Sequence, residues 1–204
     1  MSDIVQGSEA WFSSKLGRVG ASRIADVMAD GTGATRKNYM MELLCQRLTG
    51  KYEDSYTSPA MLWGIENEGL ARAIYELETG KEVRQTGGCP HPTIPMCGAS
   101  PDGYVIEGET IIGLIEIKCP NTSSFVEFWH DDKIPRRYQL QMTWQMICCG
   151  QKWCDYVCYD PRMPSNCNFK IKRFELDEKL ASEITKSVVQ FLKELDELEK
   201  EFKQ

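Results

Sequence analysis

Long apolar runs and histidines are what this 204-residue sequence has least of. No stretch of about 18 apolar residues occurs, which excludes a membrane-spanning helix. Two histidines, His91 and His130, are too few for a multi-histidine metal centre. The first residues do not join a basic segment to an apolar one, so no secretory signal is expected. A net charge of −6 excludes a protein that coats nucleic acid with its whole surface, but not one with a local basic groove or with acids that bind cations.

Internal repeats, low-complexity tracts and linkers rich in Pro, Gly or Ser are also missing. A hydrophobic fraction of 42% therefore predicts one domain that spans residues 1–204. The nine cysteines are an odd number with no export signal before them, so we expect reduced thiols in a cytoplasmic protein. Cys148, Cys149, Cys154 and Cys158 suggest zinc, but their spacing differs from that of zinc ribbons, and packing in the core is favoured.

The periodicity of the apolar residues predicts a mixed α/β fold, in which helices flank a central mixed β-sheet. We expect helices at residues 8–16, 21–28, 38–48, 60–77 and 135–149, and strands near residues 82–86, 96–99, 103–107, 111–118, 153–159 and 168–174. A long amphipathic helix is predicted at about residues 176–202.

The segment that carries chemistry is Ser100-Pro-Asp-Gly103, followed by Glu116-Ile-Lys118. Its two strands can form a hairpin through residues 107–110, which returns Asp102 to Glu116. Because side chains alternate along a strand, Glu116 and Lys118 share one face. Two carboxylates and an ammonium at one end of a sheet suit a divalent cation, to which the Ile117 carbonyl could add a ligand. A cation supplies what phosphodiester hydrolysis needs.

The common alternative for a Glu-x-Lys pattern is an exposed, ion-paired strand face. Glu116, however, interrupts an apolar run at residues 111–115, and Pro-Asp-Gly marks a kinked strand start at the right separation, so a metal site is favoured. The helix before the strands offers a third acid, Glu66 or Glu68. These two lie 200° apart on a helix, so at most one faces the site, and spacing does not choose between them. Glu68 could instead pair with Arg72 on the helix surface.

This ordered set of motifs resembles the lambda exonuclease family, also called the YqaJ-type viral recombinases, of the PD-(D/E)xK nuclease superfamily. The resemblance covers residues from about 11 to 163 and implies a restriction-endonuclease-like core. The motifs that carry it are Gly20-Ala-Ser22, Trp63-Gly64 with Glu68, Ser100-Pro-Asp-Gly103, Glu116-Ile-Lys118-Cys-Pro120, Gln139-Leu-Gln141 and Tyr159-Asp-Pro-Arg-Met163.

The resemblance implies a Mg²⁺-dependent exonuclease that digests one strand of linear double-stranded DNA from its 5′ end to mononucleotides. It implies two Mg²⁺ ions, for which Mn²⁺ can substitute, a homotrimeric ring, and a single-strand annealing protein as partner in phage-type recombination.

Carried over by position, the metal ligands that the resemblance implies are Glu68, Asp102, Glu116 and the Ile117 carbonyl. The catalytic set is Asp102, Glu116, Lys118 and Gln141, of which Lys118 and Gln141 position the water and the scissile phosphate. Ser22 and Ser100 would lie near the DNA phosphates.

One departure concerns the terminal 5′-phosphate. Where the family has an arginine ahead of its Leu-Gly pair, this chain has Lys15, with Arg18 three residues later as a substitute. Lysine lacks the bidentate fork of arginine, so the grip is expected to be weaker or shared.

Other positions have weaker expectations. Met61 matches the position of a wedge that parts the strands, although helix packing explains it equally well. Arg136 and Arg137 are expected to contact the DNA backbone, with a solvated patch as the alternative, and Arg36 and Lys37 could line the channel of a ring.

Two other functions remain open for these residues. The first is a structure-specific or restriction-type endonuclease on the same core, which would need no DNA end. The second is a non-catalytic, cysteine-stapled DNA-binding module, which would bind zinc tightly and tolerate Asp102→Ala.

Overall fold

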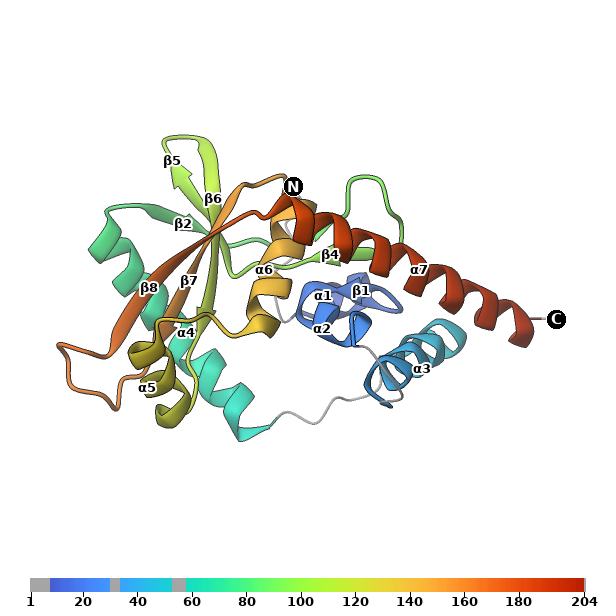
Figure 1. Ribbon diagram of the computed structural model, residues 1–204, viewed down its shortest axis with the longest axis horizontal. Coiled ribbons are helices and arrows are strands. Elements are labelled where there is room, and N and C mark those ends of the chain that lie inside the picture. The colour runs from blue at the N-terminus through green and yellow to red at the C-terminus, as the bar shows by residue number, and fades with distance from the viewer. Residues whose placement is uncertain (1–7, 30–33, 53–57, 204) are drawn as a thin grey trace.

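Two β-sheets form the framework of the computed structural model, which describes residues 8–29, 34–52 and 58–203 (Figure 1). The main sheet has the strand order β2-β5-β6-β7-β8. Its strands are β2 (Glu82–Arg84), β5 (Gly103–Glu107), β6 (Thr110–Lys118), β7 (Trp153–Tyr159) and β8 (Phe169–Glu175). The small sheet has the order β1-β4-β3, from β1 (Val19–Gly20), β4 (Cys97–Ala99) and β3 (Cys89–Pro90). Strands β6 and β7 are parallel and all other neighbours in the main sheet are antiparallel, so the sheet is mixed as predicted.

Helices surround the sheets, and their ends follow capping chemistry. They are α1 (Glu9–Lys15), α2 (Ile24–Val27), α3 (Ala34–Thr49), α4 (Pro59–Thr79), α5 (Thr122–Asp131), α6 (Arg136–Cys149) and α7 (Glu178–Phe202), with a 3₁₀ turn η1 (Ala21–Arg23) before α2. The Ser8 hydroxyl accepts a hydrogen bond from the Trp11 amide at the start of α1. Helix α4 ends at Gly80, whose left-handed φ of 67° suits glycine.

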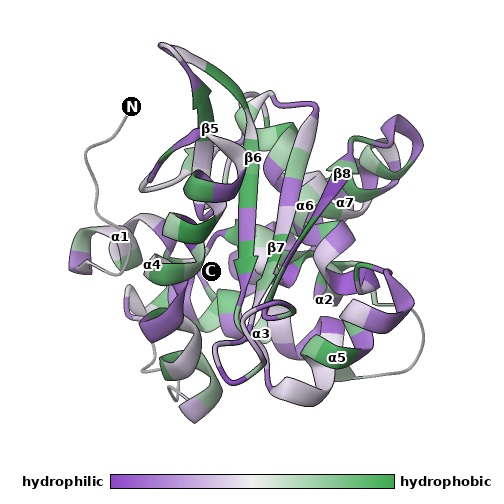
Figure 2. Cartoon of the chain, turned by 90° about the vertical axis from the view of Figure 1, so that its left-hand side faces the viewer, coloured by the Kyte–Doolittle hydropathy of each residue, from purple (hydrophilic) through white to green (hydrophobic). Residues whose placement is uncertain are grey.

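Both faces of the main sheet are covered, which decides how its polar residues are placed. Helix α4 packs on one face through Ala71 and Tyr75, against Ile115 of β6. Helices α5 and α6 pack on the other face, where Met142 and Met146 lie with Leu114 in one apolar cluster. In Figure 2, β6 is mostly hydrophobic, with hydrophilic bands towards its C-terminal end. A polar side chain on β6 that points towards α6 is therefore buried, and needs partners there.

A separate apolar cluster joins the small sheet to α2, α3, α6 and α7. The amphipathic face of α7, predicted from the sequence, contributes Ile184, Val188, Phe191 and Leu195, all fully buried. This face thus packs on its own domain, and the long C-terminal helix extends away from the main sheet (Figure 1).

The structure differs from the sequence expectation in four elements. Helix α5 was not predicted, although the Asn121 side chain caps it by accepting from the Ser124 amide at 2.9 Å and Phe125 and Phe128 are buried three residues apart. The helix expected at residues 21–28 is a 3₁₀ turn followed by a single α-helical turn. Strands β1 and β3 are two residues long, too short to show an alternating pattern. No helix in the described ranges could cross a membrane.

Candidate active site

The centre of the site is the hairpin of β5 and β6, which forms through the turn at residues 107–110 as expected. Gly103 pairs with Ile115, so Asp102, at the head of β5, lies across from Glu116. The Ile117 amide donates a hydrogen bond of 2.7 Å to Oδ2 of Asp102 and fixes that carboxylate. Asp102 is 8% exposed and Glu116 is 0% exposed. Two carboxylates are therefore held beneath the surface at the end of the hairpin.

Three donors hold the Glu116 carboxylate. Lys118 Nζ lies 2.5 Å from Oε1 of Glu116, and Nε2 of Gln141 donates to the same oxygen at 2.6 Å. Nε2 of Gln145 donates to Oε2 at 2.6 Å. Gln141 and Gln145 are one turn apart on α6, so this helix orients both oxygens. The hydrophobic run around Glu116 is thus explained by burial on both faces of the sheet, under α4 and under α6.

The net effect of burial and neighbouring charges is to raise the pKa of both Asp102 and Lys118. Burial raises the pKa of Asp102 well above its ordinary value, and the negative charges of Glu116 and Glu68 raise it further. Burial acts to lower the pKa of Lys118, but the carboxylates of Glu116 and Asp102 outweigh it and raise that pKa. Lys118 is therefore protonated at neutral pH, whereas Asp102 resists ionisation.

The two candidate acids of helix α4 differ in their surroundings. Glu68 lies close enough for its charge to raise the pKa of Asp102, while Glu66 is exposed. Glu68 also forms the helix-surface ion pair with Arg72, at 2.5 Å, that was the alternative interpretation. The ion pair and the effect on Asp102 therefore occur together in the structure.

The acids suit a divalent cation in their chemistry. The carboxylates of Glu116 and Glu68 repel that of Asp102, and hard oxygen donors are those that Mg²⁺ prefers. Within residues 8–29, 34–52 and 58–203, no three His, Cys, Asp or Glu side chains converge to hold an ion as they stand. Glu116 is bonded to Lys118 and Gln141, and Glu68 to Arg72, so a shared cation requires these bonds to rearrange.

Lys15 lies near enough to Asp102 and Glu116 for both carboxylates to act on its charge. Burial lowers the pKa of Lys15 to about 8, against the attraction of Asp102 and Glu116. Its ammonium stands over the ring of Trp11, 3.2 Å from the centroid. Arg18 is exposed, and its charge acts on Cys97 instead. The structure therefore brings Lys15, rather than Arg18, close to the acidic pair.

The other predicted DNA contacts lie at different depths. Ser22 is exposed on η1, and Ser100 is half-buried with its hydroxyl 3.5 Å from the Gly87 carbonyl. Arg136 and Arg137 are exposed at the start of α6. The Arg137 guanidinium lies 4.6 Å from the ring of Tyr138, and Lys118 Nζ lies 5.2 Å from the same ring, so Arg137 borders the site.

The wedge candidate and the two cations expected to line a channel differ in exposure. Met61 is 51% exposed in the first turn of α4, so it is not buried by helix packing. Arg36 is paired with Glu194 of α7 at 2.7 Å, while Lys37 is exposed.

All nine cysteines are free thiols. Cys148 and the pair Cys154 and Cys158 belong to two different apolar clusters, in agreement with core packing.

Sequence reasoning missed two groups of residues near the site. Gln145 follows Gln141 by four residues, a helical spacing that places both on one face of α6 and could have revealed it. The second group is an ion pair between Asp160 and Arg162, at 2.7 Å, which touches the segment after β6. The motif Tyr159-Asp-Pro-Arg-Met163 contributes to the family resemblance but does not by itself indicate a role for this ion pair.

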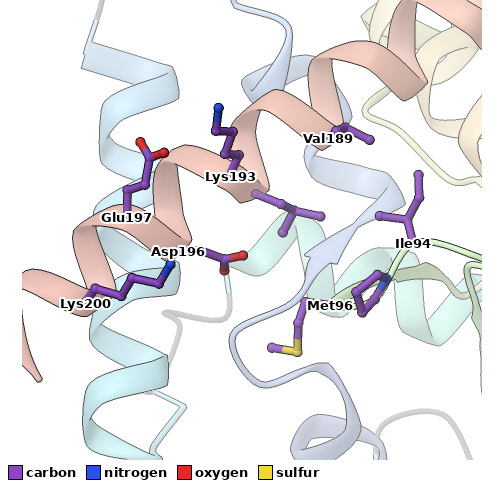
Figure 3. A pocket seen from close by; sticks show the side chains of 9 residues that line it. Ile94, Met96, Val189, Lys193, Asp196, Glu197 and Lys200 are labelled. Atoms are coloured by element: carbon purple, nitrogen blue, oxygen red, sulfur yellow. The ribbon is translucent and has the colours of Figure 1, made fainter.

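A recess elsewhere on the molecule contains none of these residues. It measures about 350 Å³ and lies between α7 and the segment before β4, where Met96 and Leu192 are among its lining residues (Figure 3). Its walls are mainly apolar side chains and the charged outer residues of α7.

Comparison with known proteins agrees with this architecture. The family model of the YqaJ-like viral recombinase domain matches residues 10–152. An alkaline exonuclease from Laribacter hongkongensis (LHK-Exo) is 46% identical, with a TM-score of 0.90 and 96% of both chains covered. The structure of LHK-Exo in complex with dAMP gives 47% identity, the same TM-score and the same coverage. A phage-related exonuclease from Haemophilus somnus 129PT shares the fold, with a TM-score of 0.75 at 16% identity, over 91% of this chain and 96% of that one. No curated protein matches the chain.

The matched domain spans well over half of the chain, and a relative of similar length is nearly half identical. Both findings confirm the resemblance inferred from the motifs, and the fold is the restriction-endonuclease-like core that it implied. The chain belongs to the family of YqaJ-like viral recombinases.

Proposed function

We propose that the protein is a Mg²⁺-dependent exonuclease that digests one strand of linear double-stranded DNA in the 5′-to-3′ direction. The products are mononucleotides, and the remaining single strand is passed to a single-strand annealing protein in phage-type recombination. The observation that carries the proposal is the buried pair of Asp102 and Glu116 beside Lys118, in a YqaJ-like domain. The relative LHK-Exo is an exonuclease, and its complex with dAMP contains a deoxynucleoside monophosphate, the class of product proposed here.

The residues around the pair have distinct roles in this proposal. Lys118 has a raised pKa, so it acts as a cation that orients water and stabilises charge on the phosphate, and it does not accept a proton. Gln141 and Gln145 hold Glu116 from α6 and set the direction of its two oxygens. The Ile117 amide holds the Asp102 carboxylate in place next to Glu116.

Glu68, Asp102, Glu116 and the Ile117 carbonyl are the proposed ligands for Mg²⁺, for which Mn²⁺ can substitute. The number of ions proposed is two, as the resemblance implies. When bound, the metal supplies Lewis acidity and a more acidic water at the phosphate. The mutual repulsion of the three acids supports this assignment, because a divalent cation would offset it.

The 5′ end of the DNA is proposed to meet Lys15, with Arg18 further out, while Ser22, Ser100, Arg136 and Arg137 approach the phosphate chain. Met61 is proposed as the wedge that parts the strands, since it is exposed near the start of α4. Lys15 is charged only below its lowered pKa of about 8. Its attraction for a terminal phosphate therefore weakens as the pH rises through that value.

Digestion of three substrates tests the proposed function: linear duplex with 5′-phosphate ends, the same duplex with 5′-hydroxyl ends, and a covalently closed circle. We expect Mg²⁺-dependent release of mononucleotides from the linear forms, fastest with 5′-phosphate, and no reaction on the circle. Lys15→Ala is expected to reduce the preference for phosphate. Cleavage of the circle would identify an endonuclease, and a lack of any cleavage with Mg²⁺ or Mn²⁺ would reject the proposal.

A homotrimeric ring is the proposed assembly. A ring can turn its acidic surface outward while its few cations, such as Lys37, Arg136 and Arg137, face the enclosed DNA, which reconciles a net charge of −6 with work on DNA. We expect sedimentation to show a trimer, and digestion to continue on one DNA molecule after competitor DNA is added. A monomer at active concentrations would reject the ring and leave the nuclease assignment intact. Binding to an open surface predicts rapid exchange and a steep salt dependence, with a slope of about −0.9 per phosphate contact.

A further inference from the structure

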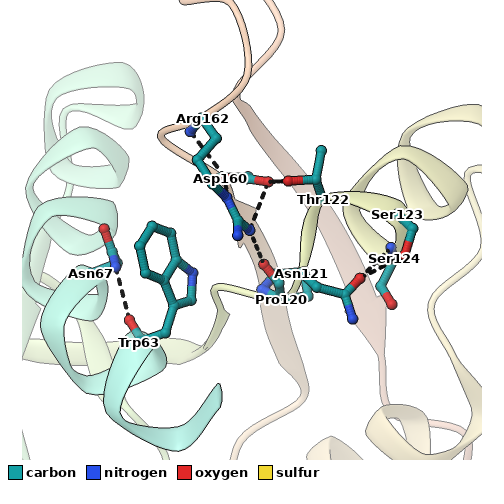
Figure 4. A network of polar contacts seen from close by, with 9 residues as sticks. All are labelled: Trp63, Asn67, Pro120, Asn121, Thr122, Ser123, Ser124, Asp160 and Arg162. Carbon is teal, nitrogen blue, oxygen red and sulfur yellow. Dashed lines mark hydrogen bonds and ion pairs between the residues drawn. The ribbon is translucent and has the colours of Figure 1, made fainter. Parts of the chain in front are cut away.

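Three segments that flank the site meet at the side chain of Arg162, which follows β7 (Figure 4). Its Nε and Nη2 donate to the two oxygens of Asp160 at 2.7 Å and 3.0 Å. Its Nη2 also donates to the Pro120 carbonyl at 2.9 Å, in the segment directly after β6. Its guanidinium lies over the ring of Trp63 on α4, 4.4 Å from the centroid. One side chain thus connects β7, β6 and α4.

Asp160 anchors this connection from inside the protein. Its side chain is fully buried, and it accepts further hydrogen bonds from the Thr122 hydroxyl at 2.7 Å and from the Arg162 amide at 3.0 Å. Burial acts to raise the pKa of Asp160, but the bonds from Arg162 and Thr122 outweigh it and lower that pKa. The carboxylate is therefore charged, and both of its oxygens accept hydrogen bonds from the protein. It thus holds the Arg162 side chain in a fixed position.

The two segments that Arg162 connects to Asp160 both contain site residues. Pro120 comes two residues after Lys118, and Trp63 comes five residues before Glu68 on α4. The position of α4 relative to β6 decides how closely Glu68 can approach Asp102 and Glu116, which do not yet converge with it on a single ion. Hydrogen bonds fix Arg162 to the segments that follow β6 and β7, and its contact with the Trp63 ring holds α4 beside them.

We infer that Arg162 is a positioning residue that sets the distance between Glu68 and the hairpin acids, and so controls how tightly the site binds a divalent cation. The inference rests on the proposed function, because it concerns the metal site of that reaction. Arg162 has a side chain that is 44% exposed, which also suits a contact to a DNA phosphate. Its Nε and Nη2 are already committed to Asp160 and Pro120, and this favours the positioning role.

Calorimetric titration of the DNA-free protein with Mg²⁺ tests the inference without relying on activity. Loss of a residue that orients metal ligands typically costs 10–100-fold in metal affinity or activity. We therefore expect Arg162→Ala to weaken Mg²⁺ affinity by about tenfold and to raise the Mg²⁺ concentration for half-maximal cleavage equally. Arg162→Lys keeps the charge over Trp63 but cannot donate to Asp160 and Pro120 together, so a smaller loss is expected. Arg84→Ala, which removes an exposed arginine paired only loosely with Glu82 at 3.6 Å, is the matched control and should match wild type.

The outcomes separate the positioning role from its alternatives. Wild-type Mg²⁺ affinity in folded Arg162→Ala overturns the inference. So does a loss of DNA affinity with a salt slope reduced by about one and unchanged Mg²⁺ binding, because that result identifies a phosphate contact. If Arg162→Ala does not fold, Arg162→Lys decides on the same measurement. Failure of the wild-type protein to bind Mg²⁺ or to cleave DNA would instead reject the proposed function.

Discussion

Asp102→Asn is expected to abolish DNA cleavage and at the same time to make the protein more stable. Loss of the carboxylate removes a proposed metal ligand, and metal assistance is worth several kcal/mol, so turnover should fall by about 10³-fold or more. The asparagine side chain keeps an oxygen for the Ile117 amide but carries no charge to repel Glu116 and Glu68. We therefore expect a higher melting temperature, by about 2–4 °C for each kcal/mol gained in a chain of this size.

The pH dependence of this stability gain follows from the sign of the pKa shift. The pKa of Asp102 is raised in the folded protein, so the unfolded chain ionises first, and ionisation of Asp102 destabilises the fold increasingly as the pH rises above its ordinary value of 3.8. The advantage of Asp102→Asn should be largest at neutral pH and disappear in acid. Thermal melts across pH, without metal, measure it. Glu107→Gln removes an exposed acid of the same hairpin and should change neither property. Normal turnover in Asp102→Asn would exclude Asp102 as a ligand.

Lys118→Ala is expected to lose cleavage to a similar extent but to destabilise the protein. Removal of Lys118 leaves Glu116 buried with two amide donors and without its ion-pair partner. Loss of one partner from a buried pair typically costs about 3–5 kcal/mol, and chemical denaturation in the absence of metal should show a loss of this order. The two substitutions thus have the same effect on activity and opposite effects on stability.

A double substitution separates charge from packing in this prediction. Adding Glu116→Gln to Lys118→Ala removes the uncompensated charge, so most of the lost stability should return while cleavage remains absent. Lys152→Ala removes a lysine from an exposed pair with Glu178, at 2.8 Å, and serves as the control with little expected effect. No recovery in the double variant would show that Lys118 stabilises the fold by packing rather than by charge.

The centre of the site could be predicted from sequence because its determinants are local. Alternation along a strand places Glu116 and Lys118 on one face, and a two-residue turn returns Asp102 to them. Periodicity likewise revealed α4, α6 and α7, whose apolar residues recur over several turns. The choice of Glu68 over Glu66 came from family resemblance, since spacing alone left both open.

The missing parts depend on contacts between distant segments. Arg162 meets Pro120 and Trp63 only after the chain has folded, and nothing local to Arg162 announces either contact. Helix α5 has few turns, and the apolar residues Phe125 and Phe128 mark only one side of it, so its period is weak beside the strands around it. The lowered pKa of Lys15 comes from burial, which composition does not reveal.

The parallel pairing of β6 with β7 has a consequence for the kinetics of folding. The contacts between β5 and β6 join residues that are close in the sequence, so this hairpin can form within microseconds. Asp102 and Glu116 are then still hydrated. Parallel strands need a crossover, here built from α5 and α6, and such long-range closure is slow. Water leaves the carboxylates only when α6 closes over β6, so their repulsion opposes that late step. The acids proposed to hold metal should therefore slow the docking of the crossover and leave the rate of hairpin formation unchanged.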